Sequence, residues 1–148
     1  PMLPAFDPSC TAPVPYVSGL WALRIETSVQ AGFPSPAEDF YAERIDVLQH
    51  IILHPQATYA LGVKGDSLSG VGIFHGDVIL VDRAIRPRHG LIVVAVVDGS
   101  FTCKRLWQQG SQIKLQAANP AYADIVPREG QTIEVWGVVL ACIKRFTT

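Results

Sequence analysis

From residue 58 onward, hydrophobic and polar positions alternate in short runs that are rich in Val, Ile, Tyr, Trp and Thr. Such runs, separated by Gly, Pro, Asn and Asp, are typical of β-strands joined by turns. They predict strands over residues 58–64, 77–82, 91–97, 101–107, 111–117 and 132–143. Asp98-Gly99 stands between two of these runs and favours a tight hairpin. Short strands at this spacing, with almost no helix, predict a compact, mostly β domain.

The first 38 residues have a different pattern. They hold Pro4, Pro8, Pro13, Pro15, Pro34 and Pro36. Proline removes a backbone donor and fixes φ, so this segment cannot form a long helix. Residues 20–29 alternate weakly, which predicts one strand. We therefore expect an extended N-terminal arm over residues 1–38 and a domain over residues 39–148.

One short helix is predicted between the arm and the β region. Asp46 and Gln49 have the spacing of a capping box. Apolar residues at Val47, Leu48, Ile51 and Ile52 form one face, and His54-Pro55 ends the helix.

Composition narrows the class of protein. The chain has 148 residues, of which 49% are hydrophobic and 17% charged, which indicates a large core, a buried oligomer interface, or both. Its formal net charge of −1 gives no basic field for DNA. The 3 cysteines lack the spacing of a disulfide framework, which favours a reducing compartment. No apolar run is long enough to span a membrane and no leader is evident, so we expect a cytoplasmic protein.

Two residues suggest hydrolytic chemistry. Ser67 follows the first predicted strand in a glycine-containing turn, and a serine hydroxyl needs a base beside it to act as a nucleophile. Lys104 lies in the second strand of the predicted hairpin, where alternation puts it on one face with Thr102 and Leu106. Loss of hydration on an apolar face disfavours the charged form of an amine, and a neutral amine can accept a proton. Considered alone, Ser67 is more simply explained as an ordinary turn residue and Lys104 as a lysine on a solvated strand face.

Several short motifs around these residues occur in order along the chain. They are Ala31-Gly32-Phe33-Pro34-Ser35-Pro36, Arg44-Ile45-Asp46, His54-Pro55, Ala57-Thr58-Tyr59, Gly65-Asp66-Ser67, Gly76-Asp77-Val78, Val81-Asp82, His89-Gly90, Phe101-Thr102-Cys103-Lys104-Arg105 and Trp136-Gly137-Val138-Val139. In this ordered set, which covers about three quarters of the chain, the sequence resembles the LexA/UmuD-type family of self-cleaving serine peptidases, and within it the UmuD branch. Ser69 adds a second hydroxyl close to Ser67.

The resemblance implies a role for each matching position. Ser67 matches the nucleophile and Lys104 the general base. The backbone amides of Asp66 and Ser67 match the oxyanion hole, and Thr102 matches a residue that orients the lysine. Ala31-Gly32 matches the bond that the peptidase cuts in its own chain. The implied fold is a LexA/signal-peptidase-like β domain, without a metal or another cofactor.

The resemblance also implies partners. Members of this family are activated by the RecA filament on single-stranded DNA. In the UmuD branch the trimmed product is a homodimer that joins a UmuC-like Y-family DNA polymerase in error-prone translesion synthesis, as part of the SOS response to DNA damage. No helix-turn-helix pattern precedes the peptidase region, so we expect no direct sequence-specific DNA binding. Because no apolar run is long enough to span a membrane, we also expect no membrane association.

Other candidate sites carry weaker signals. His50 and His54 have the spacing of a zinc-binding pair, but no third ligand is evident and a surface pair is favoured. Arg83, Arg86, Arg88 and His89 form a basic loop, for which solvation is favoured over nucleic-acid contact.

Three alternatives to a self-cleaving peptidase stay open at this point. The chain could be a non-catalytic, dimeric polymerase-accessory module that keeps the family's residues without their activity. It could be a relative of type I signal peptidases, which also use serine and lysine, although no membrane anchor is evident. It could also be the C-terminal peptidase fragment of a phage repressor.

Overall fold

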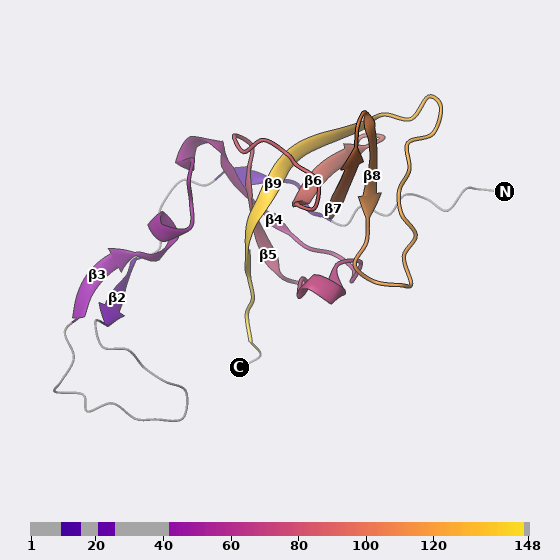
Figure 1. The fold of residues 1–148 in the computed structure, drawn as a ribbon. Coiled ribbons are helices and arrows are strands. Elements are labelled where there is room, and N and C mark those ends of the chain that lie inside the picture. Colours follow the sequence, from indigo (N-terminus) through magenta and orange to yellow (C-terminus); the bar gives the residue numbers. More distant parts are fainter. Residues whose placement is uncertain (1–9, 16–20, 26–41, 147–148) are drawn as a thin grey trace. The chain divides into compact units, whose positions relative to one another are not determined.

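The structure, a computed structural model, describes residues 10–15, 21–25 and 42–146. The chain divides into two compact units, one made of Pro1–Tyr16 with His54–Thr148 and the other of Val17–Leu53. A seven-stranded antiparallel sheet forms the first unit, and a two-stranded sheet lies in the second (Figure 1). The mostly β fold predicted from the sequence is therefore confirmed, while the boundary at residue 38 stays a prediction.

The smaller unit is built on two antiparallel strands, β2 (Trp21–Ile25) and β3 (Ala42–Asp46). β2 lies inside the strand predicted at residues 20–29, whereas β3 was not predicted. The short helix is present as a 3-10 turn, η2 (Val47–His50), and it is shorter than expected. It begins directly after Asp46, the last residue of β3, and it ends at His50 rather than at the predicted end before Pro55.

The larger sheet has the strand order β1-β4-β5-β9-β6-β7-β8. Every strand in it except β1 corresponds to a run predicted from the sequence. The bounds are β1 Val14–Pro15, β4 Thr58–Gly62, β5 Val78–Asp82, β6 Ile92–Val97, β7 Ser100–Gln109, β8 Gln112–Gln116 and β9 Ile133–Ile143. β9 lies between β5 and β6 and its register shifts once against each of them.

The β6–β7 hairpin has the turn that its sequence predicted. Asp98 and Gly99 connect Val97 to its partner Ser100, and their φ angles are +50° and +83°. Positive φ at both central residues is the requirement of the type I′ turn, whose twist matches that of the flanking strands. The hairpin fixes the register of β7, on which the lysine of the candidate site lies.

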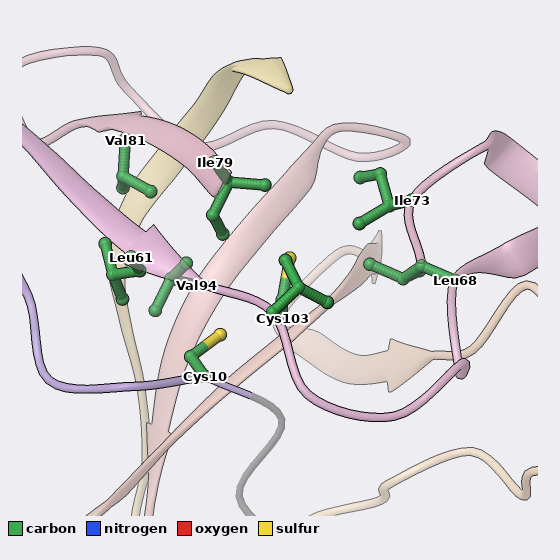
Figure 2. Close-up of a cluster of buried hydrophobic side chains, with 9 residues drawn as sticks. Cys10, Leu61, Leu68, Ile73, Ile79, Val81, Val94 and Cys103 are labelled. Carbon is green, nitrogen blue, oxygen red and sulfur yellow. The ribbon is translucent and has the colours of Figure 1, made fainter. Parts of the chain in front are cut away.

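The core has two clusters that take alternate residues of β6. One contains Val93, Ala95 and Val97, and the other contains Val94. Figure 2 shows the second cluster, in which side chains from β4 to β7 meet the loop after β4 and a residue near the N-terminus. Its buried members are Cys10, Leu61, Val63, Leu68, Ile73, Ile79, Val81, Val94 and Cys103.

Helical structure in the described residues is limited to short 3-10 turns. Besides η2 these are η3 (Pro55–Ala57), directly before β4, and η4 (Ser69–Val71), in the loop after β4. No helix in the described part of the chain has the length and apolar character needed to cross a bilayer.

Candidate active site

Ser67 lies in the loop that leaves β4. The loop turns at Gly65, whose φ of +76° is in the left-handed region that glycine adopts at low cost. One residue after Ser67, the side chain of Leu68 is buried in the core, and the amide of Ser69 donates to the carbonyl of Asp66 at 3.1 Å. Ser67 is thus held between a glycine turn and a helical turn, and only 6% of it is exposed.

Lys104 reaches this serine from β7. Its Nζ lies 2.8 Å from the Oγ of Ser67, 3.1 Å from the Oγ1 of Thr102 and 3.2 Å from the backbone oxygen of Cys103. Lys104 is only 5% exposed and Thr102 is fully buried. Burying an amine costs free energy unless it is hydrogen-bonded, and here three oxygens lie within hydrogen-bond distance of the Nζ.

The arrangement on β7 agrees with the alternation along the strand. Lys104 and Thr102 lie on one face, opposite Val93 and Ala95 of β6, while Cys103 lies in the core cluster of the other face. The structure therefore brings together Ser67, Lys104 and Thr102, which are up to 37 residues apart in the sequence.

The other predicted site groups are backbone amides and a peptide bond. Among the described residues, the amides of Asp66 and Ser67 donate no hydrogen bond. They are thus available for a developing negative charge, and their assignment as an oxyanion hole stays a prediction. Ala31 and Gly32, the predicted cleavage site, lie outside the described residues.

A segment after β8 holds the serine loop in place, which sequence reasoning missed. The amide of Ala118 donates to the carbonyl of Ser67, and the amide of Gly70 donates to the carbonyl of Ala118, both at 2.7 Å. The side-chain amide of Asn119 donates to the carbonyl of Asp66 at 3.0 Å, and the hydroxyl of Tyr122 donates to the Asp66 carboxylate at 2.6 Å. The local sequence signal here is Asn119-Pro120, a pair typical of turns, which does not reveal what the turn contacts.

The surroundings of the thiol next to the lysine favour its protonated form. A side-chain hydrogen bond with Cys10 and burial hold the pKa of Cys103 well above its usual range. A thiol is nucleophilic only as the thiolate, so Cys103 does not compete with Ser67.

The two histidines with the spacing of a zinc pair, for which a surface pair was favoured, are both exposed. The Nδ1 of His54 lies 2.7 Å from the carboxylate of Asp82, which is fully buried. Within the described ranges, no three or more His, Cys, Asp or Glu side chains gather in a way that could hold a metal ion.

One arginine of the basic loop packs against the sheet. The guanidinium carbon of Arg83 lies 4.5 Å from the ring centroid of Trp136, and its Nε donates to the backbone oxygen of the same residue. Tyr59 and Phe101 contact the Trp136 ring edge to face. Arg83 therefore covers an aromatic cluster, as expected if Trp136 is a packing residue.

Comparison with known proteins gives a family match and several similar relatives. Residues 23–140 match the family model described as Peptidase S24-like. SamA of Salmonella typhimurium (strain LT2) is 43% identical over 115 residues, which cover 78% of this chain and 79% of SamA. ImpA of Salmonella typhimurium is 38% identical over 131 residues, 88% of this chain and 86% of ImpA. The LexA repressor of Ectopseudomonas mendocina is 36% identical over 118 residues, 79% of this chain and 57% of the repressor.

The family match includes Ser67, Lys104 and the strands that position them, and it spans most of the sequence. SamA and ImpA match 78% and 88% of this chain at identities of 43% and 38%. The chain belongs to the peptidase S24 family, of the LexA/UmuD type.

Proposed function

We propose that this protein is an autocatalytic serine peptidase that cuts its own Ala31–Gly32 bond, with Ser67 as nucleophile and Lys104 as general base. The observation that carries the proposal is the 2.8 Å contact between the Nζ of Lys104 and the Oγ of Ser67 at two buried positions. Membership of the peptidase S24 family supports the class of reaction.

The surroundings of Lys104 suit a neutral amine. Its two N–H groups can donate to the Oγ1 of Thr102 and the backbone oxygen of Cys103, which both lie within hydrogen-bond distance. The lone pair then faces the hydroxyl of Ser67. Thr102 is a positioning residue in this scheme, because it acts on the serine only through the lysine.

The proposed reaction has two steps, acylation and hydrolysis of the acyl-enzyme, and Lys104 carries the proton in each. In the first, the Oγ of Ser67 attacks the carbonyl carbon of Ala31 while Lys104 takes the hydroxyl proton, and the amides of Asp66 and Ser67 stabilise the oxyanion. The C–N bond then breaks and Lys104 protonates the amine of Gly32. In the second step water attacks the acyl carbon while Lys104 accepts one of its protons, the ester C–O bond breaks, and Lys104 returns that proton to the Oγ of Ser67. The new carboxyl group of Ala31 loses its remaining proton to solvent and becomes a carboxylate.

The family relationship suggests when and why this cut is made. We propose that the RecA filament on single-stranded DNA stimulates it in the cytoplasm during the SOS response. The product, residues 32–148, would be a homodimeric subunit of an error-prone translesion polymerase of the UmuC-like Y family. Similarity to ImpA and SamA along most of both chains supports this proposal.

The test is intact mass after incubation with RecA, single-stranded DNA and ATP. We expect the wild-type chain to lose its first 31 residues and the Ser67→Ala and Lys104→Ala chains to stay whole. Ser69→Ala is the matched control, because it removes the neighbouring hydroxyl and should still be cut. Loss of the same 31 residues from Ser67→Ala would disprove the dyad, and an uncut wild-type chain would favour a non-catalytic module.

A further inference from the structure

Residues 10–15 precede the proposed cleavage bond, yet they are part of the unit that holds the candidate active site. Val14 and Pro15 form β1, which pairs with Ala60 and Tyr59 along β4. β4 is the strand that leads into the loop of Ser67. A segment upstream of the cut therefore completes the edge of the sheet next to the nucleophile.

Specific hydrogen bonds hold this segment. The amide of Thr11 donates to the carbonyl of Gly62 at 2.9 Å, and the amide of Gly62 donates to the hydroxyl of Thr11 at 2.8 Å. The threonine side chain thus replaces a backbone acceptor at this point of the ladder. A Cβ on Gly62 would lie 3.2 Å from the Cγ2 of Thr11, so glycine is what permits the close approach.

The same segment supplies a core residue. Cys10 pairs with Val63 in a β-bridge and is only 5% exposed. Figure 2 shows its side chain among the buried residues of the cluster, directed toward Cys103. Cys103 directly precedes the candidate base Lys104 in the sequence, and its backbone oxygen accepts a hydrogen bond from the Lys104 side chain. The docked segment therefore packs against the residue next to the candidate base.

Prolines limit the segment to one strand. Pro13 and Pro15 have no N–H, and prolines in sheets occur on edge strands because they cannot donate to a further neighbour. The segment therefore closes the β4 edge against further strand addition. Without it, β4 would present unpaired backbone groups beside a hole where the Cys10 side chain had been.

We propose that the edge of β4 is a strand-binding site, and that residues 10–15 of the chain itself are its ligand, which becomes dissociable once the bond after Ala31 is cut. This inference rests on the proposed function. Before the cut, the connecting chain keeps the segment at a high effective concentration. Afterwards only the contacts described here retain it, so activation has two steps, cutting and release.

The first experiment uses the uncut Ser67→Ala chain and follows alkylation of each cysteine by mass spectrometry. Exposed Cys142 is the internal reference, and Cys10 and Cys103 should react much more slowly. Thr11→Val keeps the side-chain shape but removes the hydroxyl, so Cys103 should react about fivefold faster, as expected for one lost hydrogen bond. Thr11→Ser keeps the hydroxyl and should stay within about twofold of the parent.

The second experiment uses the wild-type chain after it has cut itself. Gel filtration at low concentration should separate the N-terminal peptide, as intact mass verifies, and Cys103 should then become reactive. A synthetic peptide of residues 7–17 carrying Cys10→Ala, added in excess, should restore the protection in a saturable manner. The same peptide with Thr11→Val should require about fivefold more for half protection.

The outcomes separate the two proposals. A wild-type chain that never cuts itself under the activating conditions overturns the proposed function, and the alkylation of Ser67→Ala still decides the docking. Cys103 that reacts as fast as Cys142 in the uncut chain overturns the docking. The docking is also overturned if Thr11→Val does not change the alkylation rate of Cys103. It is overturned as well if Cys103 stays protected in the separated product, or if millimolar peptide fails to restore its protection.

Discussion

Gly70→Ala tests whether the segment after β8 positions the nucleophile. The φ angle of Gly70 is not positive, so alanine is compatible with the backbone there. A Cβ at this position would, however, lie only 2.4 Å from the carbonyl oxygen of Ala118. That contact is between a side chain and a backbone, which no rotamer change relieves, so the two segments must separate.

The expected cost follows from the contacts that this separation breaks. The Gly70–Ala118 and Ala118–Ser67 hydrogen bonds are both lost, at about 1 kcal/mol each, and overpacking adds about 1–3 kcal/mol if the loop resists. We expect the free energy of unfolding to fall by about 2–5 kcal/mol in total. A shift of Ser67 by about 1 Å should slow self-cleavage by about 100-fold.

Urea unfolding followed by tryptophan fluorescence measures the first effect, and intact mass over time measures the second. Gly72→Ala is the matched control, because nothing lies within 4 Å of its Cβ position while its φ is +85°. It should cost about 1–2 kcal/mol from backbone strain and leave the cleavage rate near that of the wild type. Wild-type cleavage by Gly70→Ala would refute the positioning role of the Ala118 segment.

Three further predictions concern the groups around the site and one distant ion pair. Self-cleavage should speed up as the pH rises above neutral, because only the neutral amine of Lys104 can accept a proton, and a flat profile by intact mass would contradict that role. Thr102→Val should slow self-cleavage about tenfold by removing an acceptor from the lysine, and Thr102→Ser should recover most of the rate. Burial raises the pKa of Asp77, but hydrogen bonds from Lys144 and the amide of Phe74 outweigh it and hold the pKa below the usual 3.8. Stabilisation by the Asp77–Lys144 pair is therefore complete above about pH 4 and is lost as the pH falls through the lower folded-state pKa. Lys144→Met should lower the free energy of unfolding by about 1 kcal/mol at pH 7, a small value because Lys144 is partly exposed, and urea unfolding near pH 2 should show little difference.

The strands were predictable where side-chain alternation and turn chemistry agree. The Asp98-Gly99 turn fixes the β6–β7 hairpin, and period-two alternation along β7 then places Lys104 and Thr102 on one face. Both signals are local, so the sequence alone contains them. The contact between Lys104 and Ser67 required the family pattern as well, because no local signal says which loop meets β7.

Elements that depend on tertiary contacts were missed. β1 has two residues and lies in a proline-rich segment, so it shows no periodicity, and the Thr11 hydroxyl and buried Cys10 hold it in place. The Asn119–Asp66 bond joins residues 53 positions apart, and a turn composition does not reveal its partner. The helix after β3 begins where it was predicted but is a 3-10 turn that ends at His50.

The central position of β9 sets a biosynthetic order for the active site. Ser67 follows β4, which pairs with β5 on one side of the sheet, and Lys104 lies in the β6–β7 hairpin on the other side. The strand β9 (Ile133–Ile143) lies between these two sides and pairs with both β5 and β6 (Figure 1). During translation residues 133–143 leave the ribosome after the nucleophile and the base have both emerged. The sheet cannot close until then, so the self-cleavage proposed above requires that β9 has been synthesised and has paired with both β5 and β6.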